Sequence, residues 1–591
     1  MKRFLSIAGI ALLVSCSGGG DPGTLPATLR VNTTSGPVTA EVAGNVAFWR
    51  NIPFAQPPVG ELRWRAPRPA SAALVAPSER KNVACLQGAW DGGGIPGNGV
   101  VGAEDCLYLD ITAPLTISTT APLPVMFWIH GGGNTSGFKG YYDFSTLVES
   151  QQVIAVAINY RLGPFGWFSH PVVQEQTKGL DRGSNFGTLD IIQALSWVQQ
   201  NISKFGGDPE NVTVFGESAG GHNVFALLAS PLSNGLFQKA ISQSGYLKTN
   251  TVEEAINANG DYPRIRRSSS QLFASMVDAG VLPDVSTESA YDVAGNILME
   301  YYLELNGQGD VPLTTADGIV ISKEGMLAAL ADSRNAKNVP VIAGANRDEV
   351  TLWMSRHRYF VNADYLLTRW LPPRITLRDP DLYAFWARIR SQAWKLRGVD
   401  EPLVAMEVAG YQALYAYRFD WDDQETSFFA DFPKLIGAAH AIDIAFVTGK
   451  YTYGPISSYV YPEGEPRDQM QALMMSAWAD FAKTGAPQIP IDWPPFSSGE
   501  RNFAHLDVGE GLRISKDQST MPSILDEAKR STLLSNTELC LLVWDSLTKV
   551  GDADYAAYAS WNKGHCSAMD ADAEQMAIDN AIIAEYGSTG F

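Results

Sequence analysis

The sequence Gly216-Glu-Ser-Ala-Gly220 places Ser218 between two glycines, a spacing that could present a serine hydroxyl as a nucleophile. The spacing alone is weak evidence: with 54 glycines in 591 residues, a G-x-S-x-G pattern arises by chance roughly once in three such chains. Its context strengthens it, because residues 212–215 (VTVF) are typical of a buried strand and residues 219–230 of a helix. A strand, a tight turn and a helix would expose the hydroxyl at the edge of a sheet, so we expect nucleophilic catalysis there.

A serine nucleophile that attacks a carbonyl needs backbone N–H groups to hold the developing oxyanion. The segment PVMFWIHGGGNTSG gives an apolar strand over residues 125–129 that runs into His130 and three glycines. Consecutive N–H groups in such a glycine run can serve as oxyanion donors, although a glycine-rich hairpin turn would have the same sequence.

The nucleophile also needs a base and an acid that orients the base. If the chain order is nucleophile, acid, base, the candidate bases are His357, His440, His505 and His565. His440 is favoured because small residues flank it in LIGAAHAIDIAFVTG, whereas His222 follows Ser218 by one helical turn and should point away from it. The acid is expected after a buried strand at residues 339–343, in a turn that contains both Asp348 and Glu349.

The composition indicates one large enzyme-sized domain. The chain is 45% hydrophobic and 18% charged, with no linker or repeat in its interior, and its formal net charge is −19, which makes nucleic acid an unfavourable partner. Scattered histidines and the absence of a phosphate-binding glycine loop with its lysine predict neither a metal nor another cofactor.

The N-terminus predicts export. Lys2 and Arg3 precede the apolar residues 4–14, a run that suits a signal peptide and is too short to span a bilayer. The following LVSCSGGG resembles a bacterial lipoprotein signal, in which cleavage after residues 1–15 leaves Cys16 lipidated and residues 16–27 as a flexible tether. Because Ser17 follows the cysteine, an outer-membrane anchor is expected; an ordinary secretory signal, with a periplasmic or secreted protein, is the alternative.

Five cysteines are an odd number for an exported chain. With Cys16 assigned to lipid, the remaining four allow three connectivities. We favour the sequence-local one, Cys85 with Cys106 and Cys540 with Cys566.

Taken together, the motifs resemble those of type-B carboxylesterases, the cholinesterase-like branch of the α/β-hydrolase family. The similarity runs in family order over most of residues 30–500. It is carried by NIPFAQPPVGELRW, EDCLYLDI, WIHGGG, INYRLGPFGWF, ALSWVQQNISKFGGDPENVTVFGESAG, ISQSG, IAGANRDE and GAAHAIDIAFVTG.

The resemblance implies an α/β-hydrolase fold: a central, mostly parallel twisted sheet flanked by helices. It implies a single catalytic domain over residues 28–591, with helical insertions near residues 250–335 and 355–435 that form a gorge over the active site. The oligomeric state stays open.

The resemblance also assigns residues to roles. It implies Ser218 as nucleophile, Glu349 rather than Asp348 as acid, and His440 as base. The implied oxyanion donors are the N–H groups of Gly132, Gly133 and Ala219. It further implies a Cys85–Cys106 disulfide and a buried ion pair between Arg63 and Glu104.

The implied reaction is hydrolysis of small to medium carboxylic esters through an acyl-enzyme. A catalytically silent recognition protein or a lipid-anchored binding protein on the same fold are the alternatives. The acidic composition favours neutral or cationic esters over strongly anionic ones. Trp90, Trp167, Phe168 and Trp353 are expected around the gorge or in the core. The chain departs from the family pattern at Asn134, beside the glycine run, and at Trp167 and Ile191.

Overall fold

The computed structural model describes residues 24–26, 29–71, 83–90, 94–118, 121–305, 313–365 and 372–591. The predicted signal peptide and Cys16 lie outside these residues. No helix among the described residues is long and apolar enough to cross a membrane.

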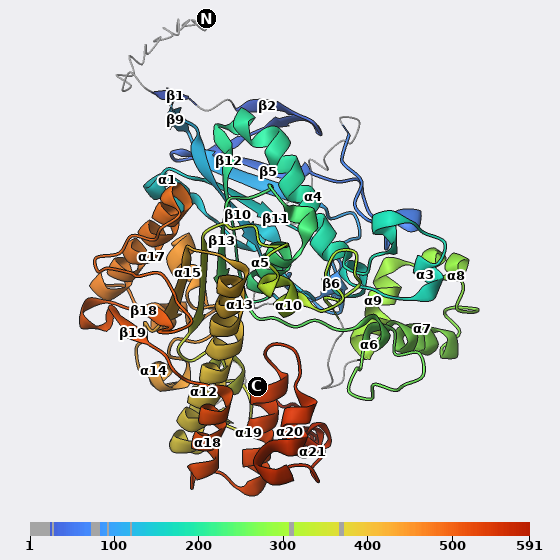
Figure 1. Ribbon diagram of the computed structural model, residues 1–591, viewed down its shortest axis with the longest axis vertical. Coiled ribbons are helices and arrows are strands. Elements are labelled where there is room, and N and C mark those ends of the chain that lie inside the picture. The colour runs from blue at the N-terminus through green and yellow to red at the C-terminus, as the bar shows by residue number, and fades with distance from the viewer. Residues whose placement is uncertain are drawn as a thin grey trace, which may run out of the picture.

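An eleven-stranded sheet forms the centre of the protein (Figure 1). Its strand order is β19-β18-β17-β14-β13-β12-β10-β11-β8-β5-β4. Neighbouring strands are parallel from β11 to β18, and the remaining pairs, at both edges, are antiparallel. In chain order the strands are β4 (Glu41–Ala43), β5 (Val46–Pro53), β8 (Tyr108–Pro114), β10 (Leu123–Ile129), β11 (Ile154–Ile158), β12 (Gly207–Glu217), β13 (Lys239–Gln243), β14 (Val341–Asn346), β17 (Leu414–Phe419), β18 (Asn502–Leu506) and β19 (Arg513–Lys516).

The central strands are apolar on both faces because helices cover both sides of the sheet. Along β10, Val125, Phe127 and Ile129 belong to one hydrophobic core, and Met126 and Trp128 belong to the other. This alternation follows from the two-residue period of a strand, and burial of both faces explains the unbroken apolar run in the sequence.

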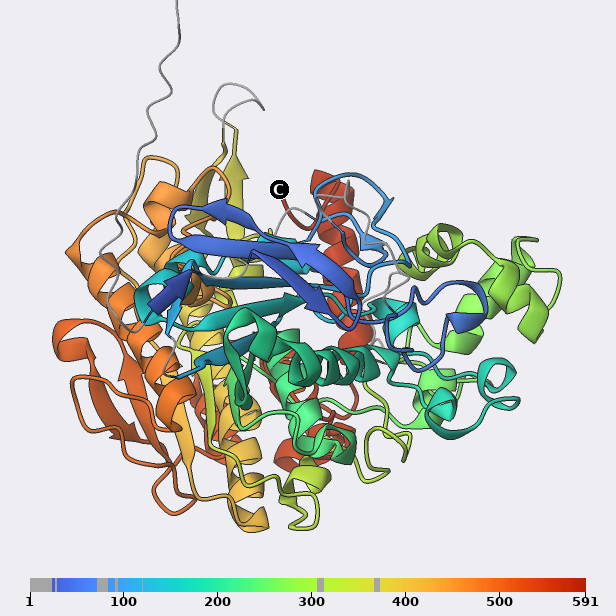
Figure 2. The same cartoon turned by 90° about the horizontal axis from the view of Figure 1, so that it is seen from above.

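Different helices supply the two cores. The first core receives side chains from α4 (Phe186–Asn201), α5 (Ala219–Ala229), α12 (Pro380–Lys395) and α13 (Glu401–Ala409). The second receives them from α1 (Ser145–Gln151), α15 (Ile444–Thr448) and α17 (Glu465–Thr484). Figure 2 shows the sheet from above with helices on its two sides.

The two segments expected as insertions differ in structure. The first holds short helices, chiefly α7 (Ser269–Asp278), α9 (Gly295–Glu304) and α10 (Met326–Ala331). The second holds the hairpin of β15 (Val361–Asp364) and β16 (Arg374–Leu377), then α12 and α13, and it also contains β17 of the central sheet.

The last part of the chain forms a helical group, α18 (Met521–Arg530), α19 (Asn536–Thr548), α20 (Tyr555–Gly564) and α21 (Ala571–Tyr586), which packs against α12 (Figure 1). The structure contains both sequence-local disulfides, Cys85–Cys106 and Cys540–Cys566. The Arg63 guanidinium donates two hydrogen bonds of 2.7 Å to the Glu104 carboxylate.

Candidate active site

Ser218 occupies a sharp turn between β12 and α5. Its backbone angles are φ 59° and ψ −120°, a conformation that is strained for a residue with a side chain. A Cβ atom at Gly220 would lie 2.0 Å from the carbonyl oxygen of Ile129, and one at Gly216 would lie 2.6 Å from the same atom. The two glycines of the motif therefore allow β12, β10 and α5 to approach closely around the turn. From residue 212 to residue 230 only Ser218 is not buried.

The imidazole of His440 is held by Glu349. Nδ1 of His440 lies 2.5 Å from Oε2 of Glu349, which is fully buried. The other carboxylate oxygen of Glu349 accepts a 2.7 Å hydrogen bond from the backbone N–H of Asn346, and the N–H of His440 donates to the carbonyl of Glu349. The acid and base are thus fixed to each other by side chain and backbone.

The neighbouring Asp348 has a different environment. Its Oδ2 accepts hydrogen bonds from the Arg347 guanidinium and from the backbone N–H of Ala438. It anchors the loop that precedes His440 and is not bonded to the imidazole.

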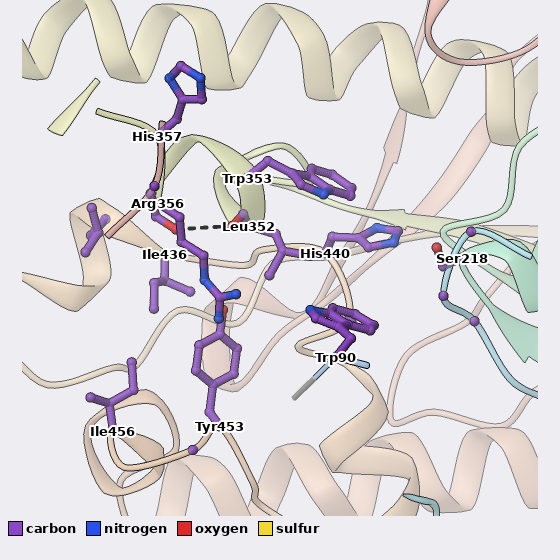
Figure 3. Close-up of a pocket in the computed structure, with 18 of the residues that line it drawn as sticks. Trp90, Ser218, Leu352, Trp353, Arg356, His357, Ile436, His440, Tyr453 and Ile456 are labelled. Carbon is purple, nitrogen blue, oxygen red and sulfur yellow. Dashed lines mark hydrogen bonds between the residues drawn. The ribbon is translucent and has the colours of Figure 1, made fainter. Parts of the chain in front are cut away.

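The second imidazole nitrogen points toward the nucleophile. Figure 3 shows the ring of His440 facing Ser218 across the pocket. Nε2 of His440 is buried and has no hydrogen-bond partner among the described residues, although Oε1 of Glu217 lies 3.1 Å away. This nitrogen is therefore available to take a proton from Ser218.

The glycine run lies directly against the nucleophile. A Cβ atom at Gly131 would be 3.1 Å from Cβ of Ser218, and Gly132 and Gly133 have φ values of +99° and +63°. No backbone hydrogen bond among the described residues is donated by the N–H of Gly132 or Gly133. Ala219 is the first residue of α5, where the helix leaves an N–H group without a partner. The N–H groups of Gly132, Gly133 and Ala219 thus lie on the two segments that adjoin Ser218.

Comparison with known proteins agrees with this geometry. The sequence model of the protein family described as the Carboxylesterase family matches residues 27–363 and 402–522. The chain belongs to the carboxylesterase family. The para-nitrobenzyl esterase of Bacillus subtilis (strain 168) is 32% identical over 526 residues, which cover 83% of this chain and 98% of that protein. Liver carboxylesterase 1F of Rattus norvegicus is 29% identical over 573 residues, covering 87% of this chain and 95% of that one.

Solved structures show the same relationship. A structure of PNB esterase superimposes with a TM-score of 0.62 at 28% identity, covering 83% of this chain and 98% of that chain. A structure of the Geobacillus stearothermophilus carboxylesterase EST55 superimposes with a TM-score of 0.64 at 26% identity, and the match covers 83% of this chain and 98% of that chain. The α/β-hydrolase fold and the family expected from the motifs are confirmed, and the protein is a serine carboxylic ester hydrolase.

The other four histidines that follow Ser218 in this carboxylesterase lie in different environments. His222 bonds the carbonyl of Tyr246 and the hydroxyl of Thr314, and burial lowers its pKa to about 4. His357 pairs with Asp579, His505 pairs with Asp420, and His565 is exposed. Among the described residues, none of their imidazoles is hydrogen-bonded to the Ser218 hydroxyl, although the backbone N–H of His222 donates to the carbonyl of Ser218.

The electrostatics of the site are dominated by buried carboxylates. Burial by itself would lower the pKa of His440, but the facing Glu217 and Glu349 carboxylates raise it to about 9. Burial raises the pKa of Glu217 to about 8 and also raises the pKa of Asp443, which accepts a hydrogen bond from Gln243. The imidazolium formed during proton transfer is therefore strongly stabilised.

A cavity of about 2180 Å³ opens above the catalytic residues. Trp90, Trp353 and Trp394 line it, and the rings of Trp353 and Trp394 lie 5.0 and 5.1 Å from the ring of His440. Trp394 and Glu217 were not singled out from the sequence. Glu217 adjoins Ser218 and could have been noticed, whereas nothing around Trp394 signals its role.

The structure also shows where three further residues singled out in the sequence lie. Trp167 and Phe168 lie in the core, where Phe168 stacks on Trp64. Asn134 does not line the cavity: its side chain is buried and accepts a 2.8 Å hydrogen bond from Asn223 of α5. Among the described residues, no group of three or more His, Cys, Asp or Glu side chains is placed to hold a metal ion.

Proposed function

We propose that the protein hydrolyses small to medium carboxylic esters with a Ser218-His440-Glu349 triad. The observation that carries the proposal is the buried contact of 2.5 Å between Glu349 and Nδ1 of His440. The other imidazole nitrogen, Nε2, has no hydrogen-bond partner among the described residues, and the ring faces Ser218, which is not buried (Figure 3). The similarity to named esterases supports the same class of substrate.

The steps follow from the geometry. Nε2 of His440 takes the hydroxyl proton while Oγ of Ser218 attacks the ester carbonyl carbon, and the N–H groups of Gly132, Gly133 and Ala219 hold the oxyanion. His440 then gives that proton to the departing alcohol, which leaves an acyl group on Ser218. His440 then takes a proton from water, whose oxygen attacks the acyl carbon. The bond between that carbon and Oγ of Ser218 breaks, the carboxylic acid leaves, and His440 returns the proton to Oγ.

An activity-based label tests the proposal. A fluorophosphonate phosphonylates an activated serine only, so wild-type protein should be labelled and Ser218→Ala should not. Ser515→Ala is the matched control, because Oγ of Ser515 also lies within hydrogen-bond distance of a histidine nitrogen, Nε2 of His505, but Ser515 is in a regular strand. Labelling that survives Ser218→Ala would refute the assignment.

We also propose that the N-terminal residues direct export and that Cys16 carries a lipid anchor to the outer membrane. The sequence pattern around Cys16 supports this proposal. In a bacterium that processes lipoproteins, wild-type protein should sediment with membranes, and Cys16→Ala should shift it to the soluble fraction or block processing. A wild-type protein that stays soluble with a free thiol at Cys16 would contradict it.

A further inference from the structure

One arginine on the wall of the active-site cavity is not neutralised by a neighbouring carboxylate. Arg356 follows the short helix α11 (Thr351–Met354) and is exposed. It comes three residues after Trp353, whose ring lies 5.0 Å from the ring of His440. Figure 3 shows its side chain extending along the pocket toward Tyr453.

The acidic side chains that line the cavity are already paired. Each lies within 3.3 Å of a basic or imidazole nitrogen: Asp143 with Lys450, Glu217 with His440, Asp545 with Arg390 and Asp579 with His357. Asp143 and Asp545 thus pair with a permanent cation, whereas Glu217 and Asp579 lie beside an imidazole.

Arg356 differs from these cavity residues. Its guanidinium forms no ion pair and no hydrogen bond with any other residue in the described part of the chain. Leu352, Ile436 and Ile456 line the pocket beside it and are apolar. Apolar neighbours do not compete with a ligand for the guanidinium, so this exposed cation stays available to an anion that enters the cavity. The planar fork of arginine also matches the two oxygens of a carboxylate.

We propose that Arg356 binds an anionic group of the substrate, so that the enzyme prefers carboxylic esters that carry a second, ionised carboxylate. This inference rests on the proposed ester hydrolysis at Ser218. The net charge of −19 predicts the opposite preference. However, charges on the outer surface are screened over a Debye length of about 8 Å, whereas Arg356 acts at contact distance inside the cavity.

Three nitrophenyl esters of similar size test the preference. Nitrophenyl butyrate is neutral, nitrophenyl hemiglutarate carries a carboxylate on the acyl side, and carboxynitrophenyl butyrate carries one on the alcohol side. The wild-type protein should have a higher kcat/KM for at least one anionic ester than for the neutral one. Which of the two it is identifies the side of the scissile bond that Arg356 faces.

The decisive variants change the charge of the cavity at two places. Arg356→Gln should lower kcat/KM for the preferred anionic ester by about 10- to 100-fold, mainly by raising KM, since the ion pair exists in the ground state as well. It should alter the neutral ester by less than about twofold. Arg356→Lys should keep part of the preference. Lys549→Gln, which removes another cation from the lining, is the matched control and should change neither ester much.

The possible failures are distinguishable. If wild-type protein hydrolyses none of the three esters and Ser218 is not labelled, the proposed function fails and this inference fails with it. If the neutral ester is hydrolysed but Arg356→Gln slows all three equally, only the anion site is refuted. An equal loss from Lys549→Gln would also refute it, because a diffuse field would then account for the preference.

Discussion

Two regions of this protein bring together a serine, a histidine and an acid. In the cavity, Glu349 lies 2.5 Å from Nδ1 of His440, whose Nε2 faces Ser218. At the edge of the sheet, Asp420 lies 2.6 Å from Nδ1 of His505, and Nε2 of His505 lies 2.8 Å from Oγ of Ser515. By hydrogen bonds alone, the second set looks more complete than the first.

The backbone separates the two sets. Ser515 is in β19, an edge strand that pairs regularly with β18, and its φ is not positive. Ser218 has φ 59° at a strand–helix turn, faces the N-terminus of α5, and borders the large cavity. The N–H groups along an extended strand point alternately to its two sides and do not converge on one oxygen, so the strand around Ser515 does not form an oxyanion hole.

The charge around each acid differs as well. Asp420 is buried, yet two hydrogen bonds from Arg418 and one from His505 lower its pKa to about 2. Arg418 thus neutralises the acid beside His505. The imidazole of His440 faces the carboxylates of Glu217 and Glu349, which raise its pKa. The comparison teaches that residue types do not distinguish the two sets, whereas the backbone at the serine and the charges beside the histidine do.

The largest difference should come from the two histidines. His440→Ala should lower kcat/KM for nitrophenyl butyrate by at least about 10⁴-fold, because the base is lost. His505→Ala should keep activity within about threefold while lowering thermal stability, since buried Asp420 loses a hydrogen bond. Steady-state kinetics and thermal unfolding measure both. If His440→Ala and His505→Ala are both folded and lose similar activity, the two regions do not differ in catalysis.

The acid of the cavity site should matter almost as much. Glu349→Gln should lower kcat by about 10²- to 10⁴-fold, because the amide no longer stabilises the imidazolium or its tautomer. Asp348→Asn should cost less than about fivefold, since Asp348 bonds Arg347 and Ala438. The same ester assay compares them. A larger loss in Asp348→Asn would reverse the assignment of the acid.

The pH dependence should reveal the carboxylates around His440. Because the base must be neutral and its pKa is raised to about 9, kcat/KM should fall on acidification with a midpoint above the usual 6.5. Glu217→Gln removes an anion that favours the protonated imidazole, so the midpoint should move to lower pH. A wild-type midpoint at or below 6.5 would show that the carboxylates do not control this histidine.

The smallest effect is expected at Ser515. Ser515→Ala removes one hydrogen bond to His505 and should lower the free energy of unfolding by about 1 kcal/mol, with unchanged kcat/KM. Denaturant unfolding gives the first value and the ester assay the second. Loss of activity without loss of stability would show that Ser515, and with it His505 and Asp420, takes part in catalysis.

Much of the site could be predicted because its local parts are encoded in short runs. The strand, the glycines and the helix around Ser218 occupy contiguous residues, and the glycine run follows directly from β10. The choice of Glu349 over Asp348 could not be derived from these residues, because it depends on which carboxylate faces a histidine 91 positions away. The family resemblance supplied that choice.

Two residues near the site could not be placed from the sequence because their orientation depends on tertiary contacts. Asn134 adjoins the glycine run, has a positive φ of 58°, and accepts a hydrogen bond from Asn223 of α5. Trp394 reaches His440 because α12 packs beside the site, and no local pattern shows the direction of that helix face. Side-chain direction at loops and between distant helices depends on tertiary packing, which a single sequence does not display.

The size of the cavity determines which molecules can reach an acyl group on Ser218. The cavity has a volume of about 2180 Å³. It exceeds the usual range of ligand pockets, about 300–1,000 Å³. A small acyl group on Ser218 therefore leaves space for a second organic molecule beside it. An added short alcohol would then compete with water for the acyl carbon, and in water-poor mixtures the protein would build new esters by alcoholysis as well as break them.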